Sequence, residues 1–216
     1  MRTNRIAALA LTFAASLAAA AACVAQEPMQ QQGAGAQPAA ARVDRRKQTK
    51  VQTASAEHGG KKAAVEVRYL DLPWGEATFG YIETGLDPRN GGYYAGRSWP
   101  IAHLRLAVPA TYDGKQLAPG DYAFVITPRD AKANRDMTLA LASFKPEAEG
   151  GTFLKAGDVF VETPKDVRVI ASKPVKFAKG GSVADQLQVA VGKQGRNVEI
   201  KFHYGDRTLT EKLKLR

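Results

Sequence analysis

Beyond residue 62, apolar side chains recur at every second position with polar side chains between them. This pattern restricts the fold of the chain more than any other feature. The first such run places Val65 and Val67 on one face and Glu66 and Arg68 on the other. A period of two is typical of strands with one buried face, whereas no stretch after Ala63 carries a 3.6-residue apolar stripe longer than two turns. The other runs are those of Leu104, Leu106 and Val108; Tyr122, Phe124 and Ile126; Met137, Leu139 and Leu141; Val167 and Val169; Leu187, Val189 and Val191; Val198, Ile200, Phe202 and Tyr204; and Leu209, Leu213 and Leu215.

Glycine-rich turn signals separate these runs, as at Asn90-Gly91-Gly92, Asp113-Gly114 and Gly180-Gly181. Gly205-Asp206 lies between two alternating runs and predicts a two-residue hairpin. Eight or more short strands with this punctuation indicate an all-β domain. We therefore expect an antiparallel β-sandwich over residues 63–216, either immunoglobulin-like or transthyretin-like, or a jelly roll.

Residues 1–25 have the composition of a secretory signal peptide. Arg2 and Arg5 precede an uncharged, Ala- and Leu-rich stretch, and Cys23 and Ala25 stand before a cleavage site at Gln26. A membrane-spanning helix is the alternative, although the stretch is short for a bilayer crossing and no basic cluster follows directly. Cys23 is the only cysteine, so we expect no disulfide in the mature domain. Cys23 itself is a candidate for lipidation.

Residues 26–62 are rich in Gln, Ala and Gly and end in a basic stretch. Such a segment contains too little apolar surface to offset its ordering entropy, so it predicts a flexible, disordered linker between the signal peptide and the sandwich. Export to the periplasm or cell envelope follows from the signal peptide. Membrane contact is then expected only through a lipid anchor or an anionic surface.

The formal net charge of the chain is +10. In a cytosolic protein this excess would suggest nucleic acid, but an exported protein meets other polyanions, such as phospholipid head groups, lipopolysaccharide phosphates and acidic polysaccharides. The alternative is that the charge only aids solubility. We expect no nucleic-acid partner.

The stretch GKQLAPGDYAFVITP at residues 114–128 resembles a motif of the exported bacterial family catalogued as domain of unknown function 2911. The resemblance extends loosely from Val65 to Phe144 and implies an exported β-domain, but the family lends no activity. A polar stretch that precedes this motif in the family is replaced here by YAGRSWP at residues 94–100. Its role therefore cannot be carried over.

The sequence contains no metal-ligand spacing and no catalytic motif. His58 lies in the linker, while His103 and His203 are predicted on solvated strand faces. The alternative is that these two histidines meet in space and bind a metal ion together with Asp121 or Glu199. Paired carboxylates can act from distant strands, and the nearest acidic cluster is Asp71, Glu76, Glu83 and Asp87. We predict no cofactor, no bound metal and no catalytic residue. A hydrolase or metal-dependent enzyme with a site at the strand ends is the alternative.

The loop from Gly85 to Pro100 is long for a compact sandwich, and loops of this length are often functional or locally packed. Aromatic rings beside guanidinium groups can bind sugar faces, acidic glycans or a protein. We therefore predict a non-enzymatic envelope protein that binds a glycan or another envelope protein here. The alternative is that these rings plug the end of the sandwich. The candidate binding residues are Tyr93, Tyr94, Arg97, Trp99, Trp74 and Arg89.

Overall fold

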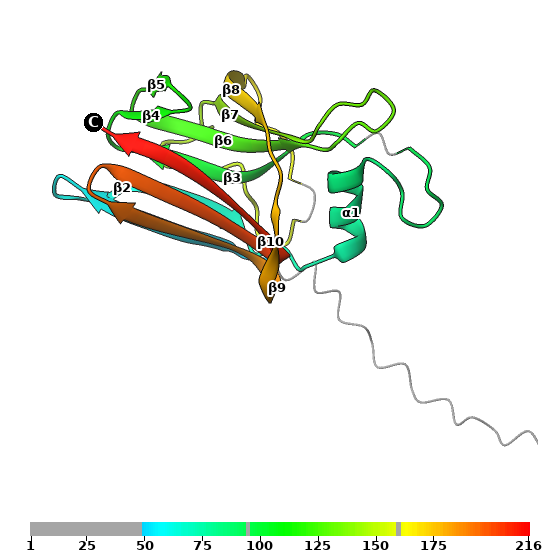
Figure 1. The fold of residues 1–216 in the computed structure, drawn as a ribbon. Coiled ribbons are helices and arrows are strands. Elements are labelled where there is room, and N and C mark those ends of the chain that lie inside the picture. The colour runs from blue at the N-terminus through cyan, green and yellow to red at the C-terminus, as the bar shows by residue number, and fades with distance from the viewer. Residues whose placement is uncertain (1–48, 94–95, 159–160) are drawn as a thin grey trace, which may run out of the picture. The chain divides into compact units, whose positions relative to one another are not determined.

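The structure, a computed structural model, describes residues 49–93, 96–158 and 161–216. Two antiparallel sheets and one short helix make up this part of the chain (Figure 1). The all-β sandwich predicted from the alternating pattern is confirmed. The predicted signal peptide, with Cys23, lies outside the described residues.

The larger sheet has six strands in the order β1-β2-β3-β6-β7-β8, and every neighbouring pair in it is antiparallel. Most neighbours in the sheet also follow one another along the chain, which is common in antiparallel sheets. Their bounds are β1 (Val51–His58), β2 (Lys61–Leu70), β3 (Trp99–Leu106), β6 (Gly120–Thr127), β7 (Thr138–Ser143) and β8 (Arg168–Pro174).

The smaller sheet has the order β5-β4-β10-β9, formed by β5 (Lys115–Leu117), β4 (Ala110–Tyr112), β10 (Asn197–Leu215) and β9 (Ala178–Gln194). β10 doubles back on itself, because the Leu215 amide donates to the Arg196 carbonyl at 2.7 Å. Its first part pairs with β9 and its last part with β4. Figure 1 shows the two parts side by side, with the C-terminus beside the β9–β10 hairpin.

The reversal in β10 falls at Gly205-Asp206, where the sequence predicted a two-residue turn. The pair Arg196–Leu215 and the ion pair Glu199–Lys212 are both centred on this peptide. Gly205 has a φ of +61°, the sign that the first central residue of a type II′ turn requires. The strand assignment continues through the turn because these residues also pair with β9.

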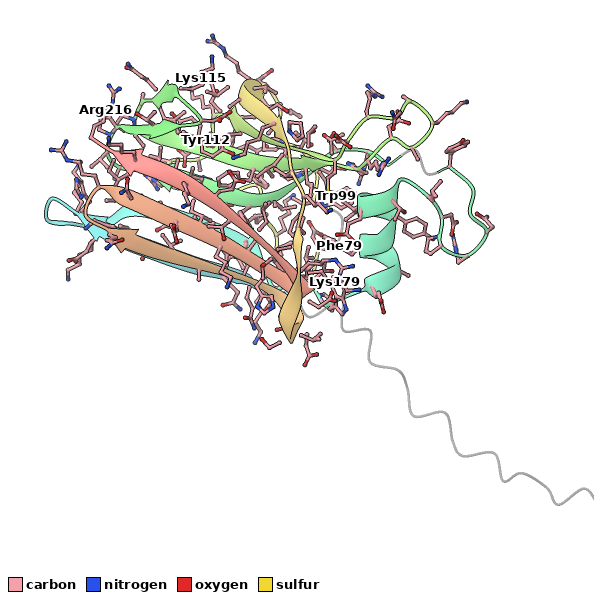
Figure 2. The ribbon with its side chains drawn as sticks, in the orientation of Figure 1. Phe79, Trp99, Tyr112, Lys115, Lys179 and Arg216 are labelled. Carbon is pink, nitrogen blue, oxygen red and sulfur yellow. The ribbon has the colours of Figure 1, made fainter. Side chains whose placement is uncertain are left out.

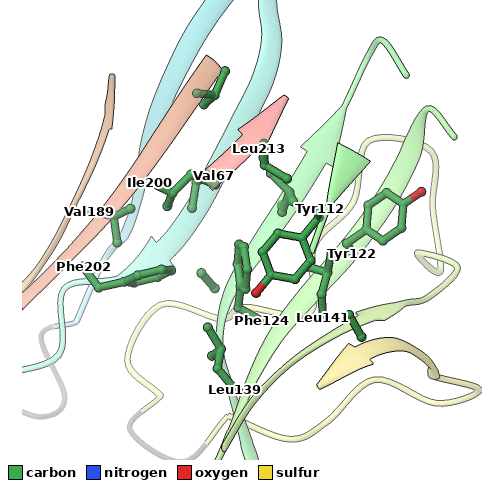
Figure 3. Close-up of a cluster of buried hydrophobic side chains, with 14 of the residues drawn as sticks. Val67, Tyr112, Tyr122, Phe124, Leu139, Leu141, Val189, Ile200, Phe202 and Leu213 are labelled. Carbon is green, nitrogen blue, oxygen red and sulfur yellow. The ribbon is translucent and has the colours of Figure 1, made fainter. Parts of the chain in front are cut away.

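The main core lies between the two sheets and consists of the side chains on the inward face of each strand. Phe124 of β6 meets Phe202 of β10 edge-on, with ring centroids 5.6 Å apart, and Tyr112 of β4 at 6.0 Å. Figure 3 shows these rings with aliphatic side chains of both sheets around them. Leu106, Ile126 and Phe202, on which the sandwich prediction depended, are all buried.

The linker prediction is wrong for residues 49–62, and its residues 26–48 lie outside the described part. Val51 to His58 forms β1, which pairs along β2 from Leu70 back to Lys61, and Thr49 is buried. The side chains of β1 are small and polar, so its apolar signal is weak. Backbone pairing with β2 supplies the order that composition did not predict. The domain therefore includes Thr49 and is longer than residues 63–216.

The outer face of the six-stranded sheet is covered by the segment that follows β7. Phe153 and Val167 pack on a second cluster that includes Val125 and Phe144, and Leu154 and Val161 pack on Leu70. This cover corrects two expectations. His103, predicted on a solvated face, is 1% exposed, and Val169, predicted on the buried face of its strand, is 59% exposed. The cover follows no strand periodicity, so the alternating pattern could not reveal it.

The helix α1 (Glu76–Thr84) was not predicted, because only Phe79 and Ile82 give it an apolar face. It ends at Gly85, whose φ of +67° and amide hydrogen bond to the Tyr81 carbonyl form a left-handed C-cap. Phe79 packs edge-on against Phe177 at 5.0 Å. The helix therefore closes one end of the core.

Candidate functional site

Trp99 of the predicted Gly85–Pro100 loop and Trp74, which lies in an earlier segment and was predicted to join it, both pack against the main core. Trp74 meets Tyr204 edge-on at 4.8 Å and lies against Gly205, at which a Cβ atom would come within 2.3 Å of its ring. Trp99 opens β3 opposite Ile126. These contacts fit the alternative given above, in which the rings close the end of the sandwich.

The other predicted loop residues are dispersed. Arg89 pairs with Asp87 at 2.8 Å, and the guanidinium group with its backbone amide holds the pKa of Asp87 well below its usual range. Tyr93 is 67% exposed and Arg97 is exposed, while Tyr94 lies outside the described residues. The described contacts therefore give Trp74, Trp99 and Arg89 structural partners and leave Tyr93 and Arg97 at the surface.

A pocket of about 620 Å³ opens instead on the outer face of the four-stranded sheet. It lies where the β9–β10 hairpin, the β4–β5 turn and the last part of β10 come together. Its lining combines polar side chains with apolar groups and, among the described residues, contains no aromatic ring. The lining residues are Thr111, Asp113, Gly114, Gly192, Lys193, Gln194, Asn197, Val198, Glu199, Lys212, Leu213 and Lys214.

Strand register explains why these side chains meet. Leu213 and Leu215 face the core, so Lys212 and Lys214 between them face outward. Lys214 lies opposite Thr111 of β4, and Glu199 lies opposite Gly192 of β9. Because β10 doubles back, Glu199 and Lys212 also become neighbours and form an ion pair of 3.2 Å. Outward-facing side chains of four neighbouring strand segments thus line the pocket: β4, the last part of β10, the first part of β10 and β9.

Most charged side chains around the pocket, at the end of the four-stranded sheet where the β9–β10 hairpin lies, are basic. We call this surface the basic face. Figure 2 labels Lys115 and Arg216 at this end of the molecule. The face carries seven basic residues but only two acidic ones, whereas the whole chain has 31 basic and 21 acidic residues. Basic residues therefore outnumber acidic ones more strongly on this face than in the chain as a whole. The basic face comprises Lys115, Lys193, Arg196, Lys201, Lys212, Lys214 and Arg216, together with Asp113 and Glu199.

Sequence reasoning noticed the positive charge but did not locate it. A signal existed in the last strands, where Lys201, Lys212 and Lys214 all occupy the polar positions of alternating runs. Their convergence depends on the reversal of β10 and on the pairing of β4 with its last part. The second of these pairings joins residues about a hundred positions apart, which strand periodicity cannot predict.

A hydroxyl, an imidazole and a carboxylate form a row beneath the cover of the other sheet. The Nε2 of His103 donates to Asp121 at 2.8 Å, and Thr152 lies 3.1 Å from Nδ1. Burial lowers the pKa of His103, with Asp121 opposing, so the ring is neutral and accepts from the Thr152 hydroxyl. The ring centroids of Phe144 and Phe153 lie 5.0 and 5.8 Å from the centroid of the imidazole ring. The row therefore joins the cover to the sheet through a buried imidazole.

The described residues contain no group of three or more His, Cys, Asp or Glu side chains that could hold a metal ion. No helix in this part of the chain is long and apolar enough to cross a membrane. Comparisons of the chain with protein-family models, curated proteins and solved structures gave no match. The family resemblance in residues 114–128 therefore stays a prediction.

Proposed function

We propose that this chain is an exported bacterial envelope protein, a non-enzymatic β-sandwich that binds an anionic ligand on its basic face. The observation that carries the proposal is that three lysines, Lys193, Lys212 and Lys214, line one pocket, and that the other four basic residues of the basic face lie at the same end of the sheet. A surface of one charge sign attracts and concentrates ligands of the opposite sign.

The side chains of the site favour binding through charge. Lys201, Lys212 and Lys214 are exposed on neighbouring rows of β10, and an ammonium group on a flexible stem accepts anions of varied geometry. Export would bring this face to phosphates of lipids and lipopolysaccharide and to acidic polysaccharides. The ligand site is placed on the basic face and not at the Gly85–Pro100 loop, because Trp99 of that loop and the neighbouring Trp74 pack against the core.

Binding of dextran sulfate, with neutral dextran for comparison, tests the proposal. The full mature chain is titrated by fluorescence anisotropy at low and high salt. The triple variant Lys201→Gln, Lys212→Gln and Lys214→Gln should bind at least about tenfold more weakly, since each contact of ~4 Å contributes about 1 kcal/mol in water. Binding should also weaken with added salt, because exposed charges are screened.

A matched variant separates a site from general charge. Lys145→Gln, Lys155→Gln and Lys165→Gln removes the same charge from exposed positions on and beside the cover of the other sheet. It should keep wild-type affinity to within about twofold. Equal losses in the two triple variants, or no binding by the wild type, would remove the proposed function.

A further inference from the structure

We propose that the ligand of the basic face is a phosphate-bearing sugar, an anion that also carries free hydroxyl groups. This inference rests on the proposed function and narrows it. The observation behind it is that two carboxylates, Asp113 and Glu199, line the same pocket as the lysines. An acidic side chain that is not paired with a cation gives a site for bare polyanions no advantage, because like charges repel.

The two carboxylates differ in what the structure gives them. Glu199 pairs with Lys212 at 3.2 Å and so helps to hold that ammonium group in place. Asp113 is exposed in the two-residue turn between β4 and β5, with a φ of +46°, and Gly114 follows it with a φ of +72°. Two positive φ values are typical of a type I′ turn, which Asn-Gly forms as well as Asp-Gly. The turn therefore does not require the negative charge of Asp113.

The remaining polar side chains of the pocket can both donate and accept hydrogen bonds. Asn197 and Gln194 face each other across the β9–β10 hairpin, and Thr111 lies opposite Lys214. Amide and hydroxyl groups, together with carboxylates that accept O–H donors, match the edge of a sugar ring. The ammonium groups of Lys212 and Lys214 match a phosphate. The pocket thus offers both kinds of partner within one lining.

Gly192 provides an independent reason to expect a ligand in this place. It lies in β9 opposite Glu199, its φ is not in the left-handed region, and a Cβ atom there would meet nothing within 4 Å. Neither backbone conformation nor packing therefore requires a glycine. Glycine weakens a strand and often marks a point where another molecule approaches the backbone closely. The missing side chain leaves the floor of the pocket open beside Glu199.

Three polymers separate the contributions of charge and hydroxyl groups. Phosphomannan carries both, inorganic polyphosphate carries phosphate without hydroxyls, and neutral mannan carries hydroxyls alone. The full mature chain should bind phosphomannan at least about tenfold more tightly, per phosphate, than polyphosphate, a difference that one or two charge-assisted hydrogen bonds provide. Neutral mannan should bind too weakly to measure at the same concentration.

Asp113→Asn is the decisive variant because it preserves the turn and removes only the charge. It should weaken phosphomannan binding by about threefold to tenfold, as expected for replacing a charged acceptor by a neutral one. It should strengthen polyphosphate binding by about twofold to fivefold, because a repulsive charge is lost. Opposite effects on the two polymers are the result expected only of a site that reads hydroxyl groups.

Gly192→Thr tests the open floor. The substitution should leave the urea midpoint unchanged or raise it, since Thr favours strands over Gly, while phosphomannan binding falls at least about tenfold. If polyphosphate binds as tightly as phosphomannan and Asp113→Asn strengthens both, the sugar inference is wrong and general anion binding remains. If neither polymer binds the wild type, the proposed function itself fails.

Discussion

The ammonium nitrogen of Lys173 lies 2.6 Å from a carboxylate oxygen of Glu211, whose side chain is 1% exposed. Tyr112 donates its hydroxyl to the same oxygen at 2.8 Å, and the Lys173 nitrogen lies 5.1 Å from the centre of the Tyr112 ring. The three residues come from β8, β10 and β4, so the cluster joins an edge of the large sheet to the small one. Burial and the Glu211 charge raise the pKa of Tyr112, which keeps its hydroxyl protonated as a donor.

Lys173→Met should destabilise the fold by about 2 kcal/mol, because it leaves Glu211 buried without a cation. The figure is below that of a fully buried pair, since Lys173 is partly exposed. Adding Glu211→Leu should restore part of the lost free energy of unfolding, because the double variant no longer buries an unpaired carboxylate. Urea unfolding measures both. Lys179→Met removes an exposed lysine with a long contact of 3.8 Å and should change nothing measurable; a larger effect there than at Lys173 would contradict the cluster's role.

Stability should fall as the pH drops from 7 to 5, through His103. Burial lowers its pKa below the usual 6.5, so the unfolded chain takes up a proton more readily than the folded one. The stabilisation is thus present above about pH 6.5 and lost as the pH falls below that value. Asp121 and Glu66 favour the charged ring, and Arg68 opposes it.

His103→Gln should flatten this pH dependence, because it removes the buried imidazole. Urea midpoints at pH 7.5, 6.5 and 5.5 provide the comparison. Parallel curves for the wild type and His103→Gln would show that other groups cause the acid sensitivity.

Gly205→Ala should destabilise the protein by about 3 kcal/mol, because its methyl group would overlap the Trp74 ring at a residue with positive φ. Gly195 has the same φ of +61°, but a Cβ atom there would meet nothing within 4 Å. Gly195→Ala should therefore cost only the backbone strain, about 1 kcal/mol. Thermal unfolding of the two variants isolates the contact with Trp74. Equal costs would mean that the close approach contributes nothing.

Expression in a bacterium should yield a chain that begins at Gln26, because residues 1–25 are predicted to be a cleaved signal peptide. Intact mass spectrometry of the mature protein distinguishes this start from the alternative, a chain that begins at a lipidated Cys23. An uncleaved chain that retains Met1 would refute both forms of export. Replacing Cys23 by Ser should leave cleavage before Gln26 unaffected.

The sequence was a good guide wherever one strand face meets the core. Leu106, Ile126 and Phe202 are buried as their alternation predicted, and the turn at Gly205 followed from its position between two runs. Periodicity failed where order comes from partners distant in the chain. Thr49 and β1 are held by β2 and the Gly157–Asp158 turn, and His103 is enclosed by Phe153, which belongs to no strand.

The candidate site was harder to predict than the fold. The aromatic residues of the Gly85–Pro100 loop and Trp74 before it stand out in the sequence, but Trp74 and Trp99 pack against the core. Lys212 and Lys214 look ordinary in the sequence, since lysine is common on exposed strand faces. They become neighbours of Asn197 and Glu199 only through the pairing of β10 with itself. Tertiary pairing thus determines which charges share a pocket.

The return of β10 has a consequence for assembly. Its last part lies between β4 and its own first part, and Leu213 and Leu215 belong to the core. The small sheet therefore cannot close until residues 207–215 have been made, because until then Tyr112 and the rest of β4 lack their pairing partner in β10.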